Sequence, residues 1–224
     1  MRKIIIILLF FVSFTVFSQD YFRITADFVV KIKKANGMKN LTKGRVYYDK
    51  NIKELIYDID FPEREKWILK DTMLYKLKNN KIKENIKIPQ INEFTIFHLA
   101  LNVSLNDFGL EGSPYKMMKV EKKNGLVLSY WKIPNQAVEN VDHIIIAKNN
   151  NKLVSVVMIA GDKKRIINKQ FFKDYQTIGG FQFPKRVIQI SYDKENRANY
   201  QVFSFKNIVV NDLINEKKYH YSNL

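Results

Sequence analysis

The sequence contains no cysteine among its 224 residues. A chain without cysteine folds without disulfides, so its stability must come from its hydrophobic core. It also offers no thiol nucleophile and no cysteine to which a lipid could be attached after export. If the chain is exported, it is therefore not a lipoprotein itself.

The motifs of common enzyme classes are also missing. The three histidines, His98, His143 and His220, stand far apart in the sequence, and none has a second ligand at metal-binding spacing. Gly112-Ser113-Pro114 lacks the pattern of a nucleophile elbow, and Gly179-Gly180 is typical of a hairpin turn rather than of a phosphate-binding loop. The sequence thus predicts a protein that is not an enzyme and has no cofactor or metal.

The first 18 residues have the pattern of a signal peptide. Arg2 and Lys3 precede a run of 14 mainly apolar residues, 4–17, and compact residues precede a cleavage point before Gln19. An uncleaved membrane anchor is the alternative, but a spanning helix needs about 20 apolar residues. We predict a signal peptide at residues 1–18, a single domain at residues 19–224, and location in the periplasm.

The remaining 206 residues carry no later apolar run of spanning length and keep a net charge of +14 of the original +16. In a cytosolic protein this charge would suggest nucleic acid, whereas export argues against nucleic acid as a partner. A basic surface could instead meet anionic lipid head groups. The lysines are spread along the whole chain, which favours a general compositional bias as the source of most of the charge.

Short segments rich in β-branched and aromatic residues recur through the chain and are separated by turn residues. The expected strands are residues 24–33, 45–49, 55–61, 67–69, 73–77, 117–121, 126–133, 143–147, 153–159, 165–175, 187–192 and 200–209. This spacing predicts a mainly β fold, an antiparallel meander that closes toward a barrel or half-barrel.

One segment, residues 91–103, has the pattern of a helix. Phe94, Phe97 and Leu101 fall on one face, and Asn92 is the expected N-cap. Residues 105–115 are expected to form a loop with at most one helical turn.

Residues 153–160 are apolar on both faces, unlike a strand with one side in water. A single helix is too small to cover so much apolar surface. The chain must either fill its interior with its own aromatic side chains or keep an apolar cavity. With 16 Phe, 12 Tyr and 2 Trp, the composition leaves both outcomes open.

Over residues 22–216 the chain resembles the LolA-like periplasmic lipoprotein carriers and the related outer membrane lipoprotein-sorting proteins. Three parts of the chain carry the resemblance: Gly44-Arg45-Val46-Tyr47-Tyr48 with Tyr57 to Pro62, Glu65 to Asp71 and Leu74-Tyr75; His143 to Ile146 with Leu153 to Val156, Asp162 and Phe171 to Tyr175; and Ile208 to Glu216.

The resemblance implies an incompletely closed antiparallel half-barrel with one or a few lid helices over an apolar concave face. It implies a carrier or chaperone that moves acyl chains of lipoproteins or lipids toward the outer membrane, between a donor protein and an acceptor protein. The chain departs from the family at Lys50 and Asn51, where carriers have an arginine that helps to hold the lid and then a proline. Lysine keeps the charge but lacks the planar multi-donor group. The family's amphipathic helix before the first strand is also missing from the sequence pattern.

On this basis the expected ligand-binding residues lie on the concave face and the lid, with Lys50 as a lid contact. They are Tyr47, Tyr57, Ile59, Trp67, Leu69, Phe94, Phe97, Leu101, Val156 and Met158. The face assigned to each strand is an assumption, because a shift of one residue turns every side chain to the other face. The alternative function is a non-catalytic envelope module with a filled core that binds a protein partner, and a weaker one is an enzyme built on this scaffold.

Overall fold

The computed structural model describes residues 21–88, 95–132, 141–161 and 165–222. Within them, thirteen antiparallel strands form one sheet. The strands are β1 (Arg23–Lys33), β2 (Lys39–Asp49), β3 (Glu54–Phe61), β4 (Glu65–Lys70), β5 (Met73–Lys78), β6 (Lys81–Lys87), β7 (Lys116–Lys123), β8 (Leu126–Lys132), β9 (Val141–Asn149), β10 (Lys152–Ala160), β11 (Ile166–Ile178), β12 (Phe181–Tyr192) and β13 (Ala198–Val210). The described helical segments are α2 (Ile96–Leu101) and the 3-10 turns η2 (Leu105–Asp107) and η3 (Glu216–Lys218).

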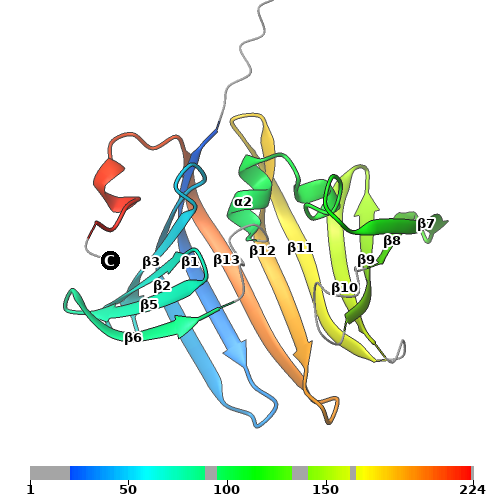
Figure 1. The fold of residues 1–224 in the computed structure, drawn as a ribbon, viewed down its shortest axis with the longest axis horizontal. Coiled ribbons are helices and arrows are strands. Elements are labelled where there is room, and N and C mark those ends of the chain that lie inside the picture. Colours follow the sequence, from blue (N-terminus) through cyan, green and yellow to red (C-terminus); the bar gives the residue numbers. More distant parts are fainter. Residues whose placement is uncertain (1–20, 89–94, 133–140, 162–164, 223–224) are drawn as a thin grey trace, which may run out of the picture.

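The order of the strands explains how α2, the expected lid, is placed over the sheet. The sheet runs β6-β5-β4-β3-β2-β1-β13-β12-β11-β10-β9-β8-β7, so the first and last strands are neighbours at its centre. The chain reaches one edge at β6, crosses to the opposite edge through the segment that contains α2 and η2, and returns strand by strand to β13. Figure 1 shows the sheet curving around this crossing segment, with α2 in front of the central strands.

The predicted fold class is confirmed. The protein is mainly β, and among the described residues the edge strands β6 and β7 do not pair, so the sheet is an open half-barrel. Ten of the twelve predicted strands agree with the observed ones to within a few residues. The other two begin six residues earlier than predicted: β2 begins at Lys39 rather than 45, and β12 begins at Phe181 rather than 187. Pro184 therefore lies inside β12, opposite Tyr175. The residue before Tyr175 in β11, Asp174, has a left-handed φ of +56°, an irregularity of the kind at which a sheet tolerates proline.

The helix is shorter than predicted. Helix α2 begins at Ile96, because Thr95 is the N-cap: its backbone is extended, and its side chain accepts a hydrogen bond from the His98 N–H. The helix ends at Leu101, and Val103 already has a left-handed φ of +56°. The predicted cap Asn92 lies outside the described residues, which resume at Thr95. The predicted helical turn in 105–115 is confirmed as η2.

The half-barrel has a core on each side of its first strands. The larger cluster fills the concave face and includes Phe28 of β1 and Tyr48 of β2, together with the lid. A second cluster on the outer face contains Tyr47, Ile56 and Tyr219. Neighbouring residues of β2 and β3 are therefore buried on opposite faces, which explains why these strands are apolar on both sides.

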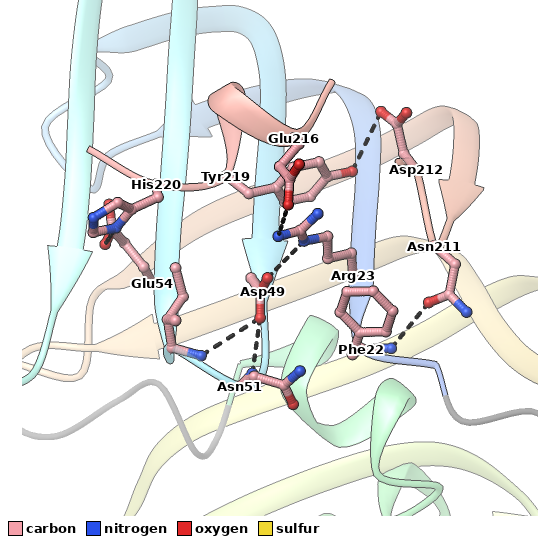
Figure 2. A network of polar contacts seen from close by, with 11 residues as sticks. Phe22, Arg23, Asp49, Asn51, Glu54, Asn211, Asp212, Glu216, Tyr219 and His220 are labelled. Atoms are coloured by element: carbon pink, nitrogen blue, oxygen red, sulfur yellow. Dashed lines mark hydrogen bonds and ion pairs between the residues drawn. The ribbon is translucent and has the colours of Figure 1, made fainter. Parts of the chain in front are cut away.

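The outer cluster is covered by the C-terminal segment, 211–222, which folds back over β1 to β4 (Figure 2). The Arg23 guanidinium donates to Asp49 over 2.6 Å and also reaches Glu216 of this segment. Burial alone would lower the pKa of Arg23, but the hydrogen bonds and charges of these two carboxylates raise it above its ordinary value. The pair with Asp49 joins β1 to β2, and the pair with the exposed Glu216 links Arg23 to the C-terminal segment.

A second tie involves a carboxylate with no solvent exposure. Glu54 of β3 accepts a hydrogen bond from the Tyr221 N–H over 2.7 Å and contacts His220 Nδ1 at 3.0 Å. Lys70 Nζ lies 3.8 Å from the same carboxylate. A buried carboxylate is tolerated only when its oxygens are paired in this way. No helix in the described part of the chain is long and apolar enough to cross a membrane.

Candidate functional site

The candidate site is the concave face of the sheet beneath the lid, α2. The lid rests on β1 and β12 and buries Phe97, of which 1% is exposed. The Phe97 ring lies 5.9 Å from Phe183, 5.4 Å from Phe205 and 6.4 Å from Tyr48, measured between ring centroids. Aromatic side chains therefore fill the concavity directly under the helix.

One polar contact ties the lid to the sheet. The Tyr48 hydroxyl lies 2.6 Å from His98 Nδ1, in a partly buried position between β2 and α2. The ring planes of the two residues also meet edge to face. Tyr48 was not among the predicted site residues, because alternation from Tyr47 assigned it to the outer face.

Replacing Tyr48 by phenylalanine is expected to weaken the attachment of the lid while keeping the packed ring. The variant loses a hydrogen bond worth about 1 kcal/mol of unfolding free energy and leaves the imidazole without this partner. We expect faster amide hydrogen exchange in α2 than in the wild type, with unchanged exchange in β9 and β10. Equal exchange in α2 of both proteins would show that the contact does not hold the lid.

Beside the lid lies a cavity of about 300 Å³, between the crossing segment and the ends of β10, β11 and β12. Its lining combines apolar side chains with a polar rim: Ala100, Val103, Leu105, Asn106, Asn150, Asn151, Lys152, Leu153, Tyr175, Gly180, Phe181 and Gln182. The Tyr175 hydroxyl donates to the Leu153 carbonyl over 2.7 Å, and burial raises the pKa of Tyr175. The volume is at the lower end of the range for ligand pockets.

Most predicted site residues lie together on the concave face. Those that belong to its apolar cluster or pack against it are Tyr57, Ile59, Trp67, Leu69, Phe97, Leu101, Val156 and Met158. The faces assumed for β3, β4 and β10 are thus the observed ones. Contact of these residues with a ligand stays a prediction.

Three predicted residues differ from this group. Tyr47 is on the outer face, where its ring meets Tyr219 edge to face at 5.4 Å, so its assignment to the cavity was wrong. No local pattern around Tyr47 indicates that a distant segment buries that face. Phe94 lies outside the described residues. Lys50 is in the turn after β2, where its N–H donates to the Phe22 carbonyl, and its role as a lid contact stays a prediction.

Tyr57 should make stability depend on alkaline pH. Burial raises the pKa of its phenol to about 12, whereas an unfolded chain has a phenol pKa of about 10. The folded protein thus keeps a proton that the unfolded chain loses, so stability is full below about pH 10 and falls as the pH rises to about 12. In urea unfolding series, Tyr57→Phe should lose less stability over this range than the wild type. Equal losses would contradict the assignment.

The histidines do not form a common site. His98 contacts Tyr48, His143 Nδ1 lies 2.7 Å from Asp142, and His220 contacts Glu54. In the described ranges, no three His, Asp or Glu side chains are grouped as metal ligands.

Comparison with known proteins shows similarity at the level of fold. No protein-family model matches the sequence, and no curated protein is similar to it. A LolA superfamily protein from Nitrosomonas europaea is similar in structure, with a TM-score of 0.59, 14% identity, and 93% of each chain covered. A putative outer membrane lipoprotein-sorting protein domain from Vibrio parahaemolyticus has a TM-score of 0.61 and 11% identity, with 87% of this chain and 88% of that chain covered.

A DUF1329 family protein from Desulfovibrio piger has a TM-score of 0.62 and 12% identity, with 90% of this chain and 91% of that chain covered. These matches cover between 87% and 93% of this chain, so they concern most of its length. The fold of this protein is the LolA-like fold.

Proposed function

We propose that the protein binds acyl chains of lipids or lipoproteins on its concave face and carries them through the periplasm toward the outer membrane. The observation that carries the proposal is an apolar concave face covered by a helix of only six residues, with a cavity of about 300 Å³ beside it. The LolA-like fold supports it. Each CH₂ group buried there would contribute about 0.8 kcal/mol to binding.

The proposed activity is non-catalytic. The lid would open, admit an apolar chain to the concave face, and close over it. Inner-membrane donor and outer-membrane acceptor proteins would supply and receive the cargo. Such a role uses only apolar burial and the movement of a short element that closes over the ligand.

Export is part of the proposal and has its own test. N-terminal sequencing of the protein recovered from the periplasmic fraction should begin at Gln19 or within a few residues of it. Recovery of the full-length chain in the membrane fraction would contradict the proposed location.

Binding is tested by titration with a fluorescent fatty acid. Val103→Trp places a large side chain at the mouth of the cavity, where Val103 is 77% exposed, so the core need not rearrange. We expect the wild type to bind and Val103→Trp to bind at least tenfold more weakly. The matched control is Val209→Trp, at a position 44% exposed on β13 and outside the cavity lining, which should bind within twofold of the wild type.

The second candidate is an envelope module that binds a protein partner and has a filled interior. The aromatic packing of Phe97, Phe183 and Phe205 beneath the lid favours it. Absence of fatty acid binding by the wild type, at protein and ligand concentrations that saturate a known carrier, would favour this candidate over the carrier.

A further inference from the structure

Three glutamines stand side by side on the three central strands at one level of the sheet. Gln189 of β12 is paired with Gln201 of β13 on one side and with Gln170 of β11 on the other. The pairing is continuous around these positions, so the three side chains project from the same face. They form a row of amides, which we call the glutamine row.

The glutamine row is on the concave face. Two residues further along the same strands lie Phe172, Val187 and Phe203, which are also directly paired with one another. Phe172 and Val187 are buried in the concave cluster, and Phe203 packs against it. Because residues two apart in a strand share a face, the glutamines point to the same side.

The row interrupts an otherwise apolar surface. Ile32 of β1 is paired with Gln201, and Val156 of β10 is paired with Gln170. Both aliphatic residues belong to the concave cluster or pack against it. All three glutamines are half-buried. The amides thus form a polar strip with apolar side chains on both sides, an arrangement that suits an amphiphilic ligand.

A second observation points to a ligand at the same place. Asn168 lies two residues from Gln170 on β11, so its side chain is on the concave face in the next row, opposite Ser191. Its Oδ1 is buried and has no hydrogen-bond partner among the described residues. Buried acceptors are almost always paired in proteins, so one that the described residues leave unpaired marks a place where a donor of a ligand can bind.

The chemistry of the row selects the ligand. Glutamine and asparagine amides donate and accept hydrogen bonds but carry no charge. Neither this row nor its neighbours Ile32, Val156, Ser191 and Asn168 contain a cation, in a chain with 38 Lys and Arg. The row offers both donors and acceptors to an ester, an amide or a hydroxyl, whereas the residues paired with it offer no opposite charge to a carboxylate or phosphate.

We propose that the glutamine row, with Asn168, binds the uncharged polar linkage of an acylated ligand, an ester or amide with a hydrogen-bond donor close to it. This inference rests on the proposed function, because it names the class of amphiphile that the concave face takes. The row is remote from the lid. Phe183 of β12 contacts Phe97 of the lid, and Gln189 lies six residues further along the same strand. Six residues of an extended strand span roughly 20 Å. The polar linkage therefore binds at the end of the half-barrel opposite to α2.

The test compares probes with the same 16-carbon chain, each displacing a fluorescent fatty acid. They are palmitic acid, which is charged, monopalmitoylglycerol, which has an ester and hydroxyls, and an N-palmitoyl tripeptide amide, which has amides only. In the Gln170→Leu/Gln189→Leu variant we expect at least tenfold weaker binding of the better neutral probe and binding of palmitic acid within twofold of the wild type. The neutral probe that binds more tightly indicates whether a glycerolipid or an acylated protein is the source of the linkage.

The matched control is Ser204→Leu on β13, a polar residue paired with Arg186 and lying between Phe203 and Phe205, so that its side chain is on the outer face. It should leave the affinities for all three probes within twofold. A further variant, Asn168→Leu, separates a binding role from a structural one. Removing the unpaired buried oxygen should raise the melting temperature and at the same time weaken binding of the neutral probe.

The outcomes separate this inference from the proposed function. If the wild type binds palmitic acid but neither neutral probe, or if the double variant binds the neutral probe as tightly as the wild type, the glutamine row is not the site while the carrier proposal stands. If the wild type binds none of the probes and no fluorescent fatty acid, the proposed function fails and the inference fails with it.

Discussion

Replacing Phe97 by alanine should lower the free energy of unfolding by about 3–5 kcal/mol, as large-to-small changes at aromatic core positions do. Phe97 is 1% exposed and contacts Phe183, Phe205 and Tyr48, which come from three different strands. The change removes the side chain that joins the crossing segment to the middle of the sheet. The measurement is urea unfolding of the variant beside the wild type.

Val103→Ala provides the control for Phe97→Ala. Val103 lies two residues beyond the end of α2 and is 77% exposed, so its truncation should change the free energy of unfolding by less than about 0.5 kcal/mol. A loss of less than about 1 kcal/mol in Phe97→Ala would mean that the lid is barely packed in solution. The fluorescent fatty acid then shows whether such a loose lid releases ligand faster.

Asp49→Ala should be comparably damaging, with an expected loss of about 3–5 kcal/mol. Only 3% of the Asp49 side chain is exposed, and it accepts from Arg23 over 2.6 Å. The same carboxylate accepts from the N–H of Asn51 in the turn that follows β2 (Figure 2). Alanine therefore leaves a partly buried guanidinium with a single exposed partner, Glu216, and removes the turn's acceptor.

Two variants control for Asp49→Ala. Asp60→Ala removes an exposed carboxylate of the neighbouring strand β3 and should stay within about 0.5 kcal/mol of the wild type. Glu216→Ala removes the exposed partner of Arg23. Because 73% of the Glu216 side chain is exposed, the change should lower the free energy of unfolding by less than about 1 kcal/mol. A small effect of all three changes would mean that the C-terminal segment is held by Tyr219 and the outer cluster rather than by the ion pairs.

The fold could be predicted from the sequence because its strands carry strong local signals. Alternation of apolar residues and hairpin turns gave the positions of most strands, and the resemblance to LolA-like carriers supplied the open half-barrel. Strand β6 was missed because its sequence, Lys81–Lys87, is exposed along most of its length and has no apolar face. A lysine-rich strand of this kind suits a sheet edge, where charge discourages pairing with other chains.

The parts that failed depend on contacts between distant segments. The site of Tyr47 is decided by Tyr219, and the burial of Glu54 by His220, 166 residues away. The start of α2 depends on which side chain captures the first free N–H groups, and the Thr95 side chain accepts from the His98 N–H. The glutamine row needs the register of three strands, because each strand contains several polar residues and none of them alone shows that its glutamine lies beside the other two.

Mass spectrometry of lipids extracted from the natively purified protein tests the central claim most directly. If the concave face carries acyl chains, the extract should contain an acylated amphiphile in an amount approaching one per protein molecule, and Val103→Trp should retain much less of it. A protein that carries no acylated molecule when purified, and that takes up neither a fluorescent fatty acid nor a neutral acyl probe afterwards, would contradict the account.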